Sequence, residues 1–129
     1  MNVKTDTKEK FSVITPVESE IPANMTEELK ELLLSYLEKD IPHVVLKLSE
    51  VETLSPPAGE TIALVQQKFY ENNASFVICG MSETVESQLE EQELLEIMNV
   101  TPTESEAWDI VQMEEIEREL LGDFDEDAQ

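Results

Sequence analysis

Cysteine, histidine and glycine are scarce in this chain, and each scarcity disfavours a kind of chemistry. The single cysteine, Cys79, cannot form an internal disulfide. His43 is the only histidine, so it has no second imidazole with which to hold a metal ion. The three glycines are isolated and form no Gly-rich phosphate-binding motif. No G-x-S-x-G motif is present either. The sequence therefore predicts no catalytic residue, no metal site and no cofactor.

Basic residues are also few, with 8 Lys and Arg against 30 Asp and Glu, which gives a formal net charge of −22. Such a surface repels phosphate backbones and anionic lipid, so we expect no nucleic-acid binding and no direct membrane binding. No apolar run approaches the roughly 18 residues of a membrane span. Two explanations of the acidic surface stay open, which are solubility and the steering of a partner that presents a basic face.

The first residues, MNVKTDTKEK, are charged and contain no apolar stretch of the signal-peptide type. Together with the lone cysteine, this start predicts a protein of the reducing cytoplasm. Because residues 1–10 show no hydrophobic period, we expect them to form a flexible arm.

The length of 129 residues and an apolar content of 40% suit one domain with a core of its own, which we place at residues 11–121. We expect Gly122 to end the last helix and residues 122–129 to form an acidic, disordered tail. The tail begins like a calcium-binding loop at Asp123. It lacks the glycine at the sixth position and the distal glutamate, so we expect no calcium site there.

Hydrophobic patterns predict strands and helices in alternation. β-Branched and aromatic runs predict strands over residues 11–15, 44–48 and 75–79, and a short strand over 17–21 that pairs back on the first. The apolar segment 94–100 leads into a brief last strand. Helical periods cover residues 26–39 and 57–73, and two further helices begin at the caps Ser82 and Thr103, the latter in a capping box with Glu106.

The resulting order, β-β-α-β-α-β-α-β-α, indicates an α/β fold with a mixed, mostly parallel sheet of four to five strands and about four helices. Within it, His43 stands at the entrance of the strand 44–48 and is interpreted as a capping or surface histidine. Cys79 is interpreted as an ordinary core thiol, because no neighbour in the sequence would activate it.

Three segments carry recognisable motifs, namely HVVLKLSEVETLSPPAG, ASFVICGMSETVESQL and LLEIMNVTPTESEAW. In this order they resemble the STAS family, the sulfate-transporter and anti-sigma-factor-antagonist domain. The family pattern has a strand that ends in Asp-Leu-Ser, then Asp-Ser-Ser-Gly opening a helix, then a strand that ends in Gly, and a Pro-Thr turn before the last helix. Lys47-Leu48-Ser49, Cys79-Gly80 and Thr101-Pro102-Thr103 match three of these pieces. The resemblance covers about residues 10–111 and implies a small STAS-like domain.

The chain departs from the family pattern where the family's regulatory serine stands. Asp-Ser-Ser-Gly falls on Ser55-Pro56-Pro57-Ala58, so the serine that is phosphorylated in the family falls on Pro57. Proline has no hydroxyl to accept a phosphoryl group and no backbone N–H to hold one at a helix start. Ser55 and Thr53 are the remaining nearby phosphoacceptors, and Ser55 is also interpreted simply as an N-cap.

The resemblance implies a non-catalytic protein-interaction module that binds an anti-sigma factor or a switch-kinase-type partner. The expected partner-binding residues surround the start of the second helix: Ser55, Pro56, Pro57, Ala58, Gly59 and Ile62. One alternative is an accessory STAS subunit of a transporter ATPase complex, and another is an enzyme or small-ligand binder. Oligomeric state is left open.

The last helix carries apolar residues beyond the family's usual end, namely Met113, Ile116, Leu120 and Leu121. We expect them to fold back on the domain, and the alternative is a face that binds a partner. Trp108, in the same helix, is expected to be a packing anchor.

Overall fold

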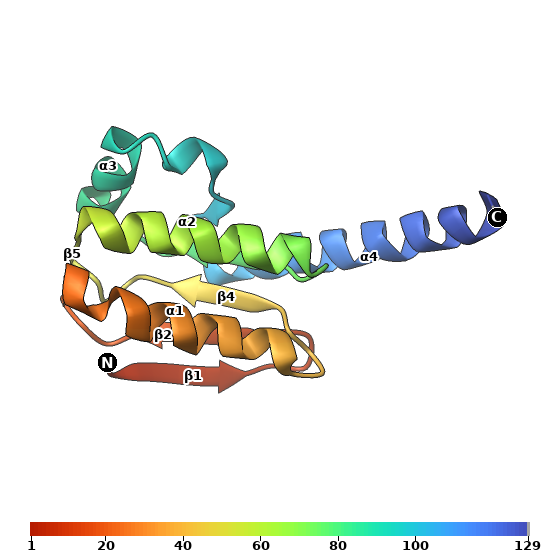
Figure 1. Ribbon diagram of the computed structural model, residues 1–129, viewed down its shortest axis with the longest axis horizontal. Helices are drawn as coiled ribbons and strands as arrows, with labels where there is room; N and C mark the ends of the chain where they lie inside the picture. The colour runs from red at the N-terminus through yellow and green to blue at the C-terminus, as the bar shows by residue number, and fades with distance from the viewer. Residues whose placement is uncertain (129) are drawn as a thin grey trace.

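The computed structural model describes residues 1–128, with side chains described through Leu121. Its centre is a five-stranded sheet with the strand order β1-β2-β4-β6-β7 (Figure 1). The first pair is antiparallel and the remaining pairs are parallel. The strands are β1 (Val3–Thr7), β2 (Ser12–Pro16), β4 (Val44–Lys47), β6 (Phe76–Cys79) and β7 (Val100–Thr101). A separate parallel pair joins β3 (Glu20–Ile21) to β5 (Thr53–Leu54).

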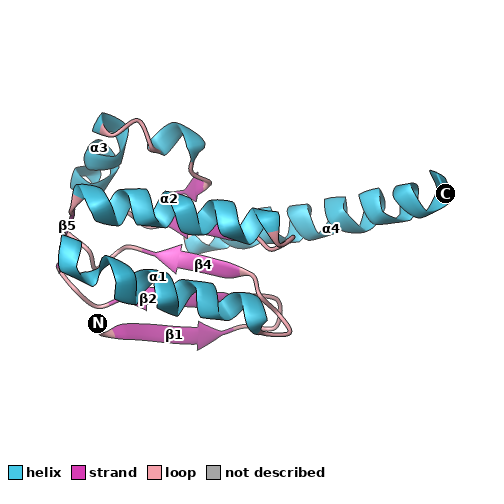
Figure 2. Cartoon of the chain, viewed as in Figure 1, coloured by secondary structure: helices cyan, strands magenta, loops and turns pink. Residues whose placement is uncertain are grey.

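Four α-helices connect and cover these strands, as Figure 2 shows. They are α1 (Thr26–Leu34), α2 (Pro56–Glu71), α3 (Glu83–Glu91) and α4 (Glu104–Ala128). Short 3-10 turns η1 (Ala23–Met25), η2 (Ser35–Glu38) and η3 (Leu95–Ile97) complete the order. The mixed, mostly parallel α/β fold expected from the sequence is confirmed.

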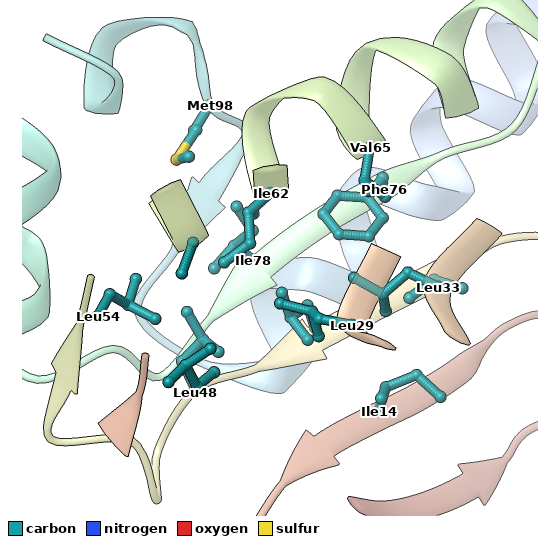
Figure 3. Close-up of a cluster of buried hydrophobic side chains, with 14 of the residues drawn as sticks. Ile14, Leu29, Leu33, Leu48, Leu54, Ile62, Val65, Phe76, Ile78 and Met98 are labelled. Carbon is teal, nitrogen blue, oxygen red and sulfur yellow. The ribbon is translucent and has the colours of Figure 1, made fainter. Parts of the chain in front are cut away.

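The central strands of the sheet are buried on both faces. Their alternate residues point in opposite directions, and each set packs in its own hydrophobic cluster. Leu46 and Ile78 point to one face and pack under α1 and α2, in the cluster that Figure 3 shows. Val45 and Val77 point to the other face and pack against Ala107 of α4 and its neighbours. The near-continuous apolar runs of β4 and β6 follow from this double burial.

Two of the expectations for the N-terminal region are wrong. Residues 3–7 form the edge strand β1 rather than a flexible arm, paired from Val3↔Pro16 to Thr7↔Ser12. Its charged, largely exposed side chains hide the strand pattern, as is common at sheet edges. The strand expected over 17–21 shrinks to β3, and it pairs with β5 instead of the first strand. This places Ile21 in the core with no exposed surface.

The last helix also differs from the expectation. α4 continues through Gly122 to Ala128. An isolated glycine inside a helix costs only about 1 kcal/mol relative to alanine, so it does not by itself end one. Gln129, the last residue of the expected tail, lies outside the described residues. Among residues 1–128, none of the helices combines the length and the apolar character that crossing a bilayer requires.

Candidate functional site

The start of α2 leaves no backbone N–H free to bind an anion. Ser55 is the N-cap, and its Oγ accepts a hydrogen bond from the N–H of Ala58 at 3.3 Å. Pro56 and Pro57 fill the first helical positions and have no N–H. The N–H of Gly59 donates to the carbonyl of Ser55 at 3.2 Å. The donors that hold phosphate at many helix starts are therefore missing or already used.

Helix α3 and the residue that caps its C-terminus hold this start in place through two glutamine side chains. Gln88 Oε1 accepts from the N–H of Leu54 at 2.9 Å, and Gln92 Nε2 donates to the carbonyl of Pro56 at 3.0 Å. The two helices approach closely at Gly59, where a Cβ would lie 2.8 Å from Gln92 Oε1 and 3.0 Å from Leu89 Cδ2. A side chain at this position would therefore displace the ends of the Gln92 and Leu89 side chains.

The structure separates the six predicted partner-binding residues into two groups. Pro56 and Pro57 are exposed and Ser55 is half-buried, whereas Ala58, Gly59 and Ile62 are buried. These last three residues are covered by their neighbours in the folded domain, so they support the surface from within, and a direct contact of theirs with a partner stays a prediction. Their apolar character serves the core.

Two exposed residues of α2 that the sequence did not single out extend this surface. Glu60 and Leu64 follow Pro57 at i+3 and i+7, so the three share one helix face. Leu64 keeps 41% of its surface exposed. We call Pro56, Pro57, Glu60 and Leu64 the α2 ridge. In the sequence, the only sign of this surface is the position of Leu64, an isolated leucine on the side of the helix opposite its apolar stripe.

The two remaining hydroxyls near the ridge are constrained. The hydroxyl oxygen of Ser55 already accepts the capping bond, which confirms the N-cap interpretation. Thr53 lies half-buried on β5. Neither Ser55 nor Thr53 therefore presents a fully exposed hydroxyl in the first turn of α2.

His43 is a buried structural residue and not the capping or surface histidine that was expected. It is 9% exposed, and its Nδ1 accepts from the backbone N–H of Ser75 at 3.0 Å. Burial, and then the charge of Arg118, lower the pKa of His43, while Glu115, 3.9 Å from Nε2, opposes this shift. Its Nδ1 bond therefore joins the loop before β4 to the loop before β6.

Cys79 is a core thiol, as expected. It has no exposed surface, and burial raises its pKa to about 11, so the protonated thiol predominates at neutral pH. No cluster of potential metal ligands occurs within the part of the chain that the structure describes.

The end of α4 contradicts the expectation that its apolar residues fold back. Met113 and Ile116 are each 56% exposed, and Leu120 and Leu121 are each 64% exposed. Trp108 does pack, as expected, because its ring stacks on Phe11 with centroids 5.0 Å apart.

Comparisons with known proteins agree with this fold. The family model of the STAS domain matches residues 2–107. A search of curated proteins finds no match to the chain. Solved structures do match, and among them is a candidate anti-sigma factor antagonist of Thermotoga maritima. It has 21% identity and a TM-score of 0.77, with 85% of this chain and 94% of that chain covered.

Two further structures match at lower identity. An anti-sigma factor antagonist of Mycobacterium paratuberculosis has 18% identity and a TM-score of 0.75 over 86% of this chain and 93% of that chain. The anti-sigma factor antagonist SpoIIAA in its unphosphorylated form has 13% identity and a TM-score of 0.68 over 86% and 96%. SpoIIAA of Bacillus also matches in its phosphorylated form, with a TM-score of 0.62. At these identities the structures show the fold, and the match of the family model over most of the chain shows that it belongs to the STAS domain family.

Proposed function

We propose that this STAS domain is a non-catalytic interaction module of the anti-sigma-factor-antagonist kind, which binds a switch kinase or anti-sigma factor through the α2 ridge. Its role is then in signalling and the regulation of transcription in the cytoplasm. Family membership supports a general protein-interaction role. The observation that carries the proposal is the rigid, exposed start of α2, capped by Ser55 and tied to α3 by Gln92.

The chemistry of the ridge suits a protein partner better than a small ligand. Pro56 and Pro57 present a preorganised apolar surface, so a partner would lose little chain entropy on binding there. Leu64 adds an apolar contact and Glu60 an exposed charge on the same face. The acidic surface of the whole chain favours a partner with a basic face.

Control by phosphate at the start of α2 is not part of the proposed function. Position 57 has no hydroxyl, and the first turn has no free N–H to stabilise a phosphoryl group. SpoIIAA, by contrast, has a phosphorylated form. We therefore propose that this chain binds its partner constitutively and that other means, such as its abundance, set its activity.

Affinity capture with surface variants tests the proposed function. The full chain is used to capture partners from its source cells, and the dissociation constant of the purified partner is then measured. We expect a kinase or anti-sigma factor, and we expect Pro57→Glu or Leu64→Glu to weaken its binding by more than about tenfold, because a buried charge costs well over 1.4 kcal/mol.

Ser105→Glu is the matched control, since it adds the same charge at an exposed position in the first turn of α4. Equal effects of all three substitutions would contradict the α2 ridge as the binding surface. Recovery of a transporter ATPase subunit instead of a signalling protein would favour the accessory-subunit alternative.

A restoration experiment tests the absence of a phospho-switch. With the captured kinase and ATP, the wild type is expected to keep its intact mass, whereas Pro57→Ser is expected to gain one phosphoryl group. Phosphate on Ser55 or Thr53 of the wild type would contradict the proposal.

A further inference from the structure

Helix α4 packs on the sheet only along its first half. Ala107 and Val111 are buried against the sheet. Farther along, Glu114 accepts a hydrogen bond from the hydroxyl of Tyr70 at 2.8 Å, and Arg118 Nη2 donates to Ser75 Oγ at 2.8 Å. The last part of the helix runs out past the end of the sheet (Figure 1).

An apolar stripe faces away from the sheet on this helix. Met113, Ile116 and Leu120 are spaced i, i+3 and i+7, so they lie within one narrow arc, roughly opposite Val111. Each is more than half exposed. We call these three residues the α4 stripe. Their spacing is that of the a and d positions of a coiled coil.

A shallow groove of about 320 Å³ continues the stripe toward the turn between β1 and β2. Ile116 and Trp108 are its apolar lining, and Lys10, Gln112, Glu115 and Glu119 surround them. The stacking of Trp108 on Phe11 holds one wall of the groove in place. The stripe and the groove share Ile116, so Trp108 adds an apolar contact beside the stripe.

The charges along α4 indicate what covers this surface. The helix has one basic residue after Trp108, Arg118, and its side chain is hydrogen-bonded to Ser75 in the loop before β6. Glu117 and Glu119 flank the stripe and are exposed. The acidic residues of this part of the helix are Asp109, Glu114, Glu115, Glu117, Glu119, Asp123, Asp125, Glu126 and Asp127.

A second copy of the chain fits this surface poorly. Pairing two α4 helices would place carboxylates against carboxylates at the flanking positions that set partner choice in coiled coils. Two chains that each carry a net charge of −22 would also repel one another. A partner helix with basic residues at these flanking positions avoids both kinds of repulsion.

We infer that the α4 stripe is a second docking surface, which binds a basic amphipathic helix of a partner protein. The apolar face of that helix packs on Met113, Ile116 and Leu120, and its Lys and Arg side chains lie against Glu117 and Glu119. This surface is separate from the α2 ridge, because it lies on another helix, and the second half of α4 runs away from the start of α2 (Figure 1).

Synthetic helices used as probes test the inference on the full chain. The main probe is a three-heptad peptide with Leu at a and d and Lys at e and g. One comparison peptide replaces Lys by Glu, and the other replaces Leu by Ser. Affinity is measured in about 0.15 M salt, where charges beyond roughly 8 Å are screened. Emission of Trp108, the single tryptophan, reports occupation of the groove.

We expect the Leu-Lys peptide to bind and both comparison peptides to bind more than about tenfold more weakly. Ile116→Gln with Leu120→Gln is expected to weaken binding of the Leu-Lys peptide by more than about tenfold, a change of about 1.4 kcal/mol or more. The matched control is Ile41→Gln with Ile97→Gln, since both residues are exposed elsewhere, at 42% and 63%. It is expected to leave the affinity unchanged.

Three results would overturn the inference. The Ser-Lys peptide could bind as tightly as the Leu-Lys peptide, which would show attraction by charge alone. The stripe variant could bind as the wild type does. Finally, sedimentation could show a dimer that the stripe variant converts to a monomer, which would assign the stripe to a second copy. None of these results depends on the α2 ridge.

Discussion

Gly59 illustrates how one residue without a side chain controls the distance between two helices. It sits in the first turns of α2 and faces Leu89 of α3 and Gln92 at the C-cap of α3, where an added Cβ would come within 2.8 to 3.0 Å of their side chains. At most helical positions, alanine in place of glycine adds about 0.5–1 kcal/mol of stability. Here the close contacts reverse that gain.

We predict that Gly59→Ala lowers the free energy of unfolding by about 1–2 kcal/mol, because overpacking displaces Leu89 and the Gln92 bond to Pro56. Urea unfolding measures the change. In the double variant with Gln92→Ala, the cost of Gly59→Ala is expected to shrink, because the displaced side chain is already absent. Purely additive effects of the two substitutions would contradict a steric cause.

His43 makes the stability of the folded chain depend on pH. Burial and Arg118 hold its pKa below the ordinary value of 6.5, and its Nδ1 must stay unprotonated to accept from the N–H of Ser75. His43 therefore binds a proton more readily in the unfolded chain than in the folded one. Its contribution to the free energy of unfolding is fully present above pH 6.5 and falls as pH decreases below that value. We predict a loss of stability in this range, measured by urea unfolding.

His43→Asn is the control for this prediction. Its Oδ1 accepts from the N–H of Ser75 in place of Nδ1 and does not titrate there. The variant is expected to lose less stability between pH 7 and 5 than the wild type. The same pH dependence in both proteins would show that His43 is not its cause.

At the scale of elements, α2 depends on its cap. Ser55 provides the one side-chain acceptor for the first turn, to the N–H of Ala58. We predict that Ser55→Ala lowers the free energy of unfolding by about 1 kcal/mol, because that N–H loses its partner. Ser105→Ala, at an exposed position of α4 that caps nothing, is expected to change it by less than about 0.5 kcal/mol. Equal changes would refute the importance of the cap.

Elements with a strong local pattern could be predicted from the sequence, and elements defined by distant partners could not. The apolar runs of β4 and β6 and the Ser-Pro-Pro start of α2 are local signals, and each element forms where it was expected. The short strands β3 and β5 exist only because they pair with each other across the distance from Ile21 to Leu54. No local period reveals such a pair.

The same distinction applies to the candidate site. The cap at Ser55 and the two prolines were visible in the sequence because capping acts within one turn. The burial of Ala58 and Gly59 could be seen only once α3 and the sheet were in place. Gln88 and Gln92 are polar residues on a polar helix, and nothing local marks them as partners of Leu54 and Pro56. His43 was misjudged for the same reason.

At the scale of the whole molecule, the net charge of −22 opposes the compact state. We predict that the thermal unfolding midpoint rises when sodium chloride is raised from about 0.01 to 0.5 M, because the screening length falls from about 30 Å to a few ångströms. Potassium chloride at equal ionic strength is expected to give the same rise, since screening does not depend on the cation. A midpoint that stays constant or falls would contradict net self-repulsion.

The molecule thus carries two exposed surfaces on different helices, the α2 ridge and the α4 stripe. The central claim concerns the first, because it assigns this STAS domain its partner surface. Nuclear magnetic resonance of the isotope-labelled chain, titrated with the captured signalling partner, tests that claim most directly. We predict that the largest shift changes fall on the amides from Ala58 to Leu64. Unchanged signals over those residues, with the changes on other elements, would contradict it.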